Sequence, residues 1–397
     1  MPGLLAIADF RRLWFVGFVA NVVRWLEMLA FALFAYEVTG SAFVVAALTM
    51  LRLLPMGLFG AFLGVAADRV ERRGALIAIV AVSLITTLVL AAMAAFGAIK
   101  VWHLALACFI NGICWAADNP VRRTMIGDAV GPDRMAMAMA VDIATSNITR
   151  VVGPALSGVL LARFGIAGVF WLCAALYGAS LVAALGLKVR RRAAHAGRTS
   201  FAASMREGIA CLRGDERLIG VFVITMIFNV FGWPFLSMVP IIGTEHFLLG
   251  PQGVGLLASC DGIGGILGAL FIAGLARPAW HGRIYAGSVA IYLMMVIAFA
   301  TASAVSMAAA LLFLIGTIGV GFSVLQTTLV YRAAPPVLRA RMLGLLSMCI
   351  GSGPLGFVYL GFLADVYTPR AGSLMLAAQG VLVLVCTRRY WQAALRA

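Results

Sequence analysis

Charged side chains are scarce in this chain. Asp, Glu, Lys and Arg supply 11% of the 397 residues, whereas 63% are hydrophobic and the mean hydropathy is +1.05. Ordinary globular domains are roughly 45–50% apolar, so a soluble protein of this length could not bury the excess. The shortage of charge therefore excludes a soluble enzyme or binding domain and indicates an integral membrane protein.

Sequence motifs for catalysis, nucleotide binding and metal binding are also missing. The only two lysines, Lys100 and Lys188, lie outside any Gly-x-x-x-x-Gly-Lys pattern, so we do not expect this chain to hydrolyse ATP. The sequence has no Gly-x-Ser-x-Gly or His-Glu-x-x-His motif, and its four histidines are scattered. Its seven cysteines form no Cys-x-x-Cys pair and are expected to pack as small apolar side chains. We expect neither an enzyme nor a bound cofactor or metal.

Long apolar runs make up most of what is present. Because runs of about 20 apolar residues satisfy their backbone hydrogen bonds in lipid only as helices, the sequence predicts an all-α membrane protein. Twelve runs have spanning length, at 13–36, 42–63, 75–98, 101–121, 138–162, 165–187, 218–242, 252–275, 284–303, 305–331, 342–364 and 371–387.

Basic residues are concentrated in alternate connections between these runs. With the N-terminus in the cytoplasm, most of the 30 Lys and Arg residues fall in cytoplasmic loops, and only Lys100, Arg163 and Arg370 fall outside. This asymmetry follows the positive-inside rule, so it predicts cytoplasmic termini in a bacterial cytoplasmic membrane. The net charge of +15 then reflects topology and attraction to membrane lipid, without nucleic acid as a partner.

The chain divides near its middle. One long, arginine-rich connection separates six runs from six, and part of it has apolar residues at helical spacing, which predicts an amphipathic helix on the membrane surface. The Gly-Pro pair at 153–154 recurs at 353–354, at the matching place in the second half. The predicted parts are a first six-helix bundle at 1–187, a cytoplasmic linker at 188–217 and a second six-helix bundle at 218–397.

A charged cluster interrupts the apolar sequence between the second and third runs. It resembles the first-half cytoplasmic signature of the major facilitator superfamily, with Glu71 where that signature usually has glycine. Four further stretches, 206–212, 229–240, 255–268 and 339–342, resemble the exporter branch that contains macrolide-efflux proteins and the enterobactin exporter. The residues that carry the signature are Gly64, Asp68, Arg69, Arg72 and Arg73.

The resemblance implies a fold of two six-helix bundles and a role for the charged cluster. In the family this cluster is thought to latch the outward-facing state. Asp68 is suited to accept hydrogen bonds from a helix N-terminus, that of the eleventh run being our candidate. The arginines can pair with Asp118 or Asp128 at the inner end of the fourth run. Alternatively, they serve only as positive-inside determinants.

Ionisable residues inside the apolar runs are costly and mark a transport pathway or a proton relay by default. Glu27 is our leading proton carrier, because a low-dielectric site favours the neutral form of a carboxyl group. Asp142 and Asp261 are weaker candidates, and Asp142 lies near the predicted inner surface. The alternative for Glu27 is a static ion pair with Arg24 or Arg150 that holds helices in register.

Polar and aromatic residues on the run faces define a candidate substrate cavity. The fifth run carries polar and small residues on one face from 142 to 157, and this face must line a cavity or pack on another helix. Arg150 suits recognition of a carboxylate or catecholate, unless Glu27 or Asp142 neutralises it. Trp115 and Trp233 can stack on an aromatic substrate or simply pack. The candidates are Asn21, Arg24, Asn111, Trp115, Asn147, Arg150, Asn229, Trp233 and Gln326.

Three functions remain compatible with these observations. The first is a proton-driven exporter that works by alternating access on a small amphipathic or anionic compound, such as a siderophore, a metallophore or a drug. The second is an importer of the same fold, carrying a lysolipid or a nutrient, since fold does not fix function. The third is a membrane sensor that transports nothing. We expect the exporter, with a small molecule, protons and membrane lipid as partners and with a monomeric state.

Overall fold

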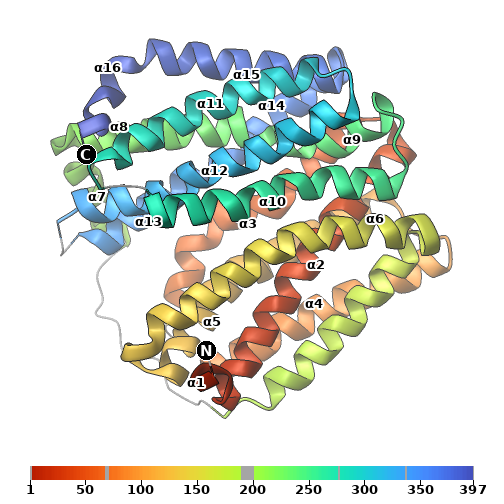
Figure 1. The fold of residues 1–397 in the computed structure, drawn as a ribbon. Helices are drawn as coiled ribbons and strands as arrows, with labels where there is room; N and C mark the ends of the chain where they lie inside the picture. Colours follow the sequence, from red (N-terminus) through yellow and green to blue (C-terminus); the bar gives the residue numbers. More distant parts are fainter. Residues whose placement is uncertain (1, 68–70, 189–200, 276–277, 336–337, 397) are drawn as a thin grey trace. The chain divides into compact units, whose positions relative to one another are not determined.

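The computed structural model describes residues 2–67, 71–188, 201–275, 278–335 and 338–396. All regular structure within these ranges is helical (Figure 1). Eleven of the described helices are long and apolar enough to cross a membrane. The all-α membrane prediction is therefore confirmed.

The first half of the chain forms a short helix and five long ones. Their bounds are α1 (Pro2–Leu5), α2 (Ala8–Thr39), α3 (Ala42–Ala67), α4 (Arg72–Ala95), α5 (Val101–Val130) and α6 (Pro132–Leu185). Helix α6 has 54 residues, which at about 1.5 Å per residue exceeds twice the ~30 Å hydrocarbon thickness. It doubles back at Gly165, whose φ of 62° favours glycine, so it supplies two spans (Figure 1). The eleven helices thus give the twelve predicted spans.

The second half contains more interruptions. Its helices begin with α7 (Phe201–Gly214), where the sequence predicts an amphipathic helix, and Arg341 forms an ion pair there with Glu207. The others are α8 (Glu216–Ile227), α9 (Val239–Glu245), α10 (Pro251–Leu275), α11 (His281–Thr301), α12 (Val305–Ala333), α13 (Arg339–Ile350), α14 (Gly353–Val366), α15 (Pro369–Cys386) and α16 (Arg388–Trp391), with short turns η3 (Pro278–Trp280) and η4 (Gln392–Arg396).

The predicted seventh span is not one regular helix. A π-helical turn, η1 (Phe228–Gly232), and a 3-10 turn, η2 (Trp233–Ser237), lie between α8 and α9. Pro234 sits at the start of η2 and has no backbone N–H to continue an α-helical ladder. Single π turns inside α-helices are frequently found at functional sites.

Contacts divide the chain into two compact units. The first unit comprises 1–38, 51–196 and 249–259, and the second comprises 39–50, 197–248 and 260–397. Each unit therefore includes the first turns of one long helix that continues in the other unit, α10 for the first and α3 for the second. The division between 196 and 197 falls inside the linker predicted at 188–217. The bundle limits at 187 and 218 stay predictions.

Each unit has its own apolar core. In the first, buried residues occur on all sides of α2, as expected for a helix surrounded by others, and α4 packs on both α5 and α6. In the second, Phe322 stacks on Phe228 and Tyr285, and the Tyr285 hydroxyl donates to the carbonyl of Val221. The candidate site described next lies wholly within the first unit.

Candidate functional site

Glu27 of α2 lies at the centre of the first unit and is 0% exposed. Arg52 of α3 donates from Nη2 to its Oε2 at 3.0 Å. Asn111 of α5 donates from Nδ2 to both carboxylate oxygens, at 3.0 and 3.2 Å. The Thr87 hydroxyl of α4 donates to the carbonyl of Ser83 at 2.9 Å, and its oxygen lies 3.5 Å from Oε1. Four helices therefore meet at a single carboxyl group.

The partner of Glu27 differs from the two that the sequence suggested. Arg52, which is only 6% exposed, forms the ion pair, whereas Arg24 and Arg150 do not. The Arg24 guanidinium instead lies 4.2 Å from the ring centre of Trp115, a cation–π contact. Spacing along α2 favoured Arg24, because residues three apart share a face, but the burial of Arg52 on a neighbouring helix decides the pairing.

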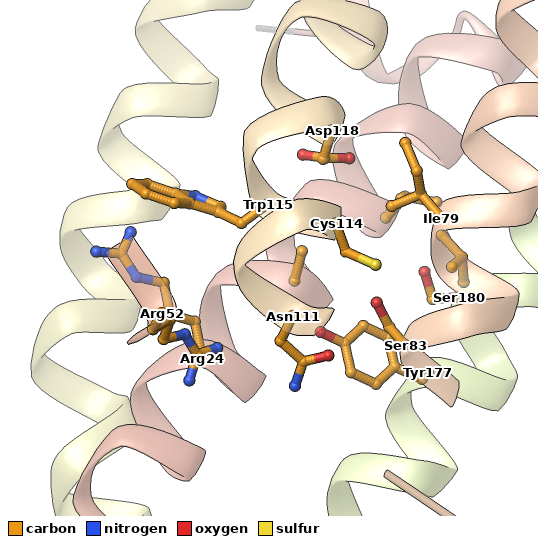
Figure 2. Close-up of a pocket in the computed structure, with 13 residues that line it drawn as sticks. Arg24, Arg52, Ile79, Ser83, Asn111, Cys114, Trp115, Asp118, Tyr177 and Ser180 are labelled. Atoms are coloured by element: carbon orange, nitrogen blue, oxygen red, sulfur yellow. The ribbon is translucent and has the colours of Figure 1, made fainter. Parts of the chain in front are cut away.

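A small cavity is lined in part by Arg52 and Asn111, the two residues that donate to Glu27 (Figure 2). Its volume of about 30 Å³ holds about two water molecules, since one needs roughly 10–15 Å³. Three buried atoms in its lining, Arg52 Nη1, Asn111 Oδ1 and Ser180 Oγ, have no hydrogen-bond partner among the described residues. Buried polar atoms of this kind are normally satisfied by ordered water. The cavity is therefore suited to water and too small for a drug-sized molecule.

The cavity extends along one face of α5. Figure 2 shows Asn111, Cys114 and Asp118 in succession on this helix, with Tyr177 and Ser180 of α6 across from them. Asn111 and Asp118 are seven residues apart, which is about 10 Å of helix. The space thus leads from the Glu27 site towards a second buried charge cluster.

Arg122 forms the centre of this second cluster and is 2% exposed. Its Nε contacts Asp118 Oδ2 at 3.0 Å, and its Nη1 contacts Asp142 Oδ1 at 2.5 Å. The guanidinium also lies directly against Gly17 of α2, where a Cβ atom would overlap it. Arg123, which is half exposed, is 3.6 Å from the second oxygen of Asp142. The cluster holds α5 and α6 together through opposite charges.

The candidate latch is only partly described by the structure. Arg72 forms an ion pair with Asp128 at 2.8 Å, and Arg73 donates to the carbonyl of Leu185. Asp118 pairs with Arg122 instead of a loop arginine. Asp68 and Arg69 lie outside the described residues, and Gly64 lies within α3. The role of the cluster as a latch remains a prediction.

The polar face of α6 packs on α2. Ser157 donates to the carbonyl of Leu26, and Gly153 lies against Trp25, where a Cβ would overlap the side chain. The other contacts are Ser146 with Asn21 at 3.3 Å and Arg150 with Trp25, whose ring centre is 5.9 Å from the guanidinium carbon. The sequence left two alternatives for this face, lining a cavity or packing on another helix. At these positions the face packs on another helix. Arg150 and Asn147 are half-buried.

The remaining candidates lie in the second unit. Asn229 donates to the carbonyl of Thr225 within its own span, and Trp233 packs edge-on against Phe357. Asp261 and Gln326 are both buried. Among the described residues of either unit, no group of three or more His, Cys, Asp and Glu could hold a metal ion.

A multi-span helical bundle with buried charges on facing helices is typical of a membrane transporter. The profile of the family described as "transmembrane secretion effector" matches residues 3–395. The chain belongs to this family, within the major facilitator superfamily, and is a multi-pass protein of the cytoplasmic membrane.

Three curated relatives are similar in sequence. Macrolide efflux protein A of Streptococcus pyogenes is 23% identical over 268 residues, or 66% of either chain, so just under two thirds of its length is matched. The multidrug efflux pump Tap of Mycolicibacterium fortuitum is 26% identical over 93% of this chain and 92% of its own. The staphyloferrin A transporter of Staphylococcus aureus is 23% identical over 64% of each.

Solved structures agree on the fold. The nucleoside transporter NupG superposes with a TM-score of 0.75 at 16% identity, covering 96% of this chain and 99% of its own. A bacterial homologue of the lysosomal transporter Spinster gives 0.76 at 16% identity, covering 100% and 98%. The predicted twelve-helix major facilitator fold is therefore confirmed.

Proposed function

We propose that this transporter exports a small amphipathic or anionic compound in exchange for protons, with Glu27 as the proton carrier. Export is supported by the relatives, two of which are named as efflux proteins. Proton exchange is supported by one observation, the fully buried carboxyl group of Glu27 between Arg52, Asn111 and a water-sized cavity.

Both protonation states of Glu27 have partners in this site. The ionised form accepts hydrogen bonds from Arg52 and Asn111. The neutral form can donate to the oxygen of Thr87, whose own proton is already directed to Ser83. A carboxyl group with partners in either state can load and release a proton without being left unsatisfied.

Protonation changes the environment of Arg52 more than that of Glu27. Once Glu27 is neutral, the guanidinium of Arg52 is left buried without its counterion, which is strongly unfavourable. The position of α3 in this arrangement then becomes less stable relative to one in which Arg52 reaches water or an anion. Protonation is therefore coupled to movement of α3, as alternating access by proton exchange requires.

The cavity provides the proton with a route. Water between Asn111 and Asp118 would bridge the Glu27 site and the Arg122 cluster through polar atoms of Ser180 and Tyr177. Arg24 and Trp115 also line this cavity, so the proposed proton route runs beside residues that are suited to cargo.

An anionic or aromatic cargo suits the residues beside this site. Arg24 and Arg150 are half-buried and lie over the rings of Trp115 and Trp25. Arginine offers bidentate recognition of carboxylates, and tryptophan offers a stacking surface. The staphyloferrin A transporter among the relatives is consistent with a siderophore-like compound.

The cargo can be identified by mass spectrometry of cells and medium with and without this protein, under iron-replete and metal-starved growth. We expect a metabolite that accumulates inside deletion cells and is missing from their medium. A compound that instead disappears from the cells on deletion would support the importer.

The carrier is then tested with that cargo in proteoliposomes under an imposed pH gradient. Glu27→Gln should abolish pH-driven transport but leave exchange down the cargo's own gradient. Glu37→Gln is the matched control, because Glu37 is an exposed acid on the same helix. Unchanged pH-driven transport by Glu27→Gln would reject Glu27 as the carrier.

A further inference from the structure

A groove in the second unit lies between α10, α11 and α12, away from the site described above. Its volume is about 460 Å³ and its lining is mostly apolar, which is within the ~300–1,000 Å³ range of ligand pockets. Each of the three helices contributes one glycine to the lining, namely Gly268, Gly287 and Gly321. None of these three positions projects a side chain into the groove.

The glycines act in two different ways. Gly268 allows α10 to lie directly against the carbonyl of Thr317 on α12, so it brings the helices together. Gly287 has no atom within 4 Å of the place where a Cβ would be, so it leaves space open. Phe271 and Ile291, both exposed, stand beside this space and make its walls apolar.

One end of the groove is positively charged. Arg283 and Trp280 line this end, and Arg283 is exposed and forms no ion pair among the described residues. Arg332 lies nearby, with its Nη1 3.5 Å from Nδ1 of His281. Helix α11, which carries Arg283, contains no Asp or Glu.

We propose that this groove binds an anionic phospholipid of the surrounding membrane. The phosphate would bind at Arg283, and an acyl chain would lie over Gly287 between Phe271 and Ile291. Tryptophan at headgroup level and basic pockets between membrane helices are recurrent features of lipid recognition. A zwitterionic lipid fits less well, since its ammonium group would face the exposed guanidinium of Arg283.

The test uses the full-length protein, stripped of lipid in detergent and titrated with phosphatidylglycerol or phosphatidylcholine of identical acyl chains. Native mass spectrometry counts the bound lipid, and thermal unfolding reports stabilisation. We expect phosphatidylglycerol to bind roughly fivefold or more tightly than phosphatidylcholine, the preference that one arginine can supply. Equal binding of the two lipids would overturn the proposal.

Two variants separate the headgroup site from the chain site. Arg283→Gln should remove the preference for phosphatidylglycerol, whereas the control Arg388→Gln changes an exposed arginine elsewhere in the same unit and should retain it. Gly287→Leu should remove binding of both lipids by filling the groove. Its control is Gly178→Leu, at another helical glycine with open space around it. Unaltered lipid binding in Arg283→Gln or in Gly287→Leu would contradict the proposed site.

A soluble competitor distinguishes a lipid from a simple anion. Glycerol phosphate carries the same phosphate chemistry without acyl chains, so it should not displace phosphatidylglycerol at equal concentration. Displacement by glycerol phosphate would show that the groove binds simple anions. Preferential binding of a cationic amphiphile would show that the groove is a side entrance for substrate. Either result would reject the lipid proposal.

Discussion

Two buried charge clusters in the first unit use the same chemical groups in different proportions. At Glu27, one carboxylate faces one arginine and an amide. At Arg122, one buried arginine lies between two carboxylates, with Arg123 at the edge. In the first cluster, protonation of Glu27 leaves Arg52 of α3 without a carboxylate partner among the described residues. In the second cluster, Arg122 keeps Asp118 as a partner if Asp142 is protonated, so we infer a structural role for it.

The largest expected difference between the clusters is in proton coupling. Glu27→Gln should lose pH-driven efflux down to the level of empty vesicles, because its side chain no longer takes up a proton. Asp142→Asn should keep it, since Arg122 retains Asp118 as a counterion. Transport assays on both variants in the same vesicles check this. If Asp142→Asn also loses its response to the pH gradient, the proton route includes the second cluster.

Removing the arginine of the second cluster should cost the most stability. Arg122→Ala leaves two buried carboxylates without their main partner, and breaking a buried ion pair typically costs about 3–5 kcal/mol. Arg123→Ala, at a half-exposed position, should cost less than about 1 kcal/mol. Unfolding in detergent compares the two. Similar losses for both variants would show that burial does not distinguish these arginines.

A smaller effect is expected at the glycine beneath Arg122. Gly17→Ala places a Cβ atom where the guanidinium lies, and overpacking typically costs about 1–3 kcal/mol. Gly178→Ala, with open space around it, is the control and should be close to neutral. The Glu27 site should be unaffected, so pH-driven transport should remain in Gly17→Ala if it still folds. A neutral Gly17→Ala would show that Arg122 can move aside.

The sequence predicts the fold more completely than the site. Long apolar runs are sufficient to define membrane helices, which is why the twelve spans could be placed. Hydropathy predicted the two spans on either side of Gly165 as separate runs. It could not show that they belong to one helix that doubles back at this glycine. The interruption around Pro234 was also missed, because proline is tolerated in membrane helices and does not by itself indicate a π turn.

The site residues show where sequence reasoning stops. Glu27 could be identified because an acid in an apolar run is costly, and Asn111 because it shares a face with other polar residues. Arg52 lies within the run at 42–63 but was not among the candidates, because its partner lies on another helix, which spacing cannot reveal. Arg122 comes directly after the run predicted at 101–121, whereas α5 continues to Val130. The i, i+4 spacing of Asp118 and Arg122 was the signal that could have identified it.

Helix α3 has a further consequence for how the transporter responds to a proton. Its first turns belong to the second unit up to Met50, and from Leu51 onward it belongs to the first. Arg52, the counterion of Glu27, is the second residue after this division. An α-helix transmits displacement along its axis because its hydrogen-bonded backbone is stiff over a few turns. A change in the charge of Glu27 therefore acts on α3 at the second residue after this helix passes from the second unit to the first.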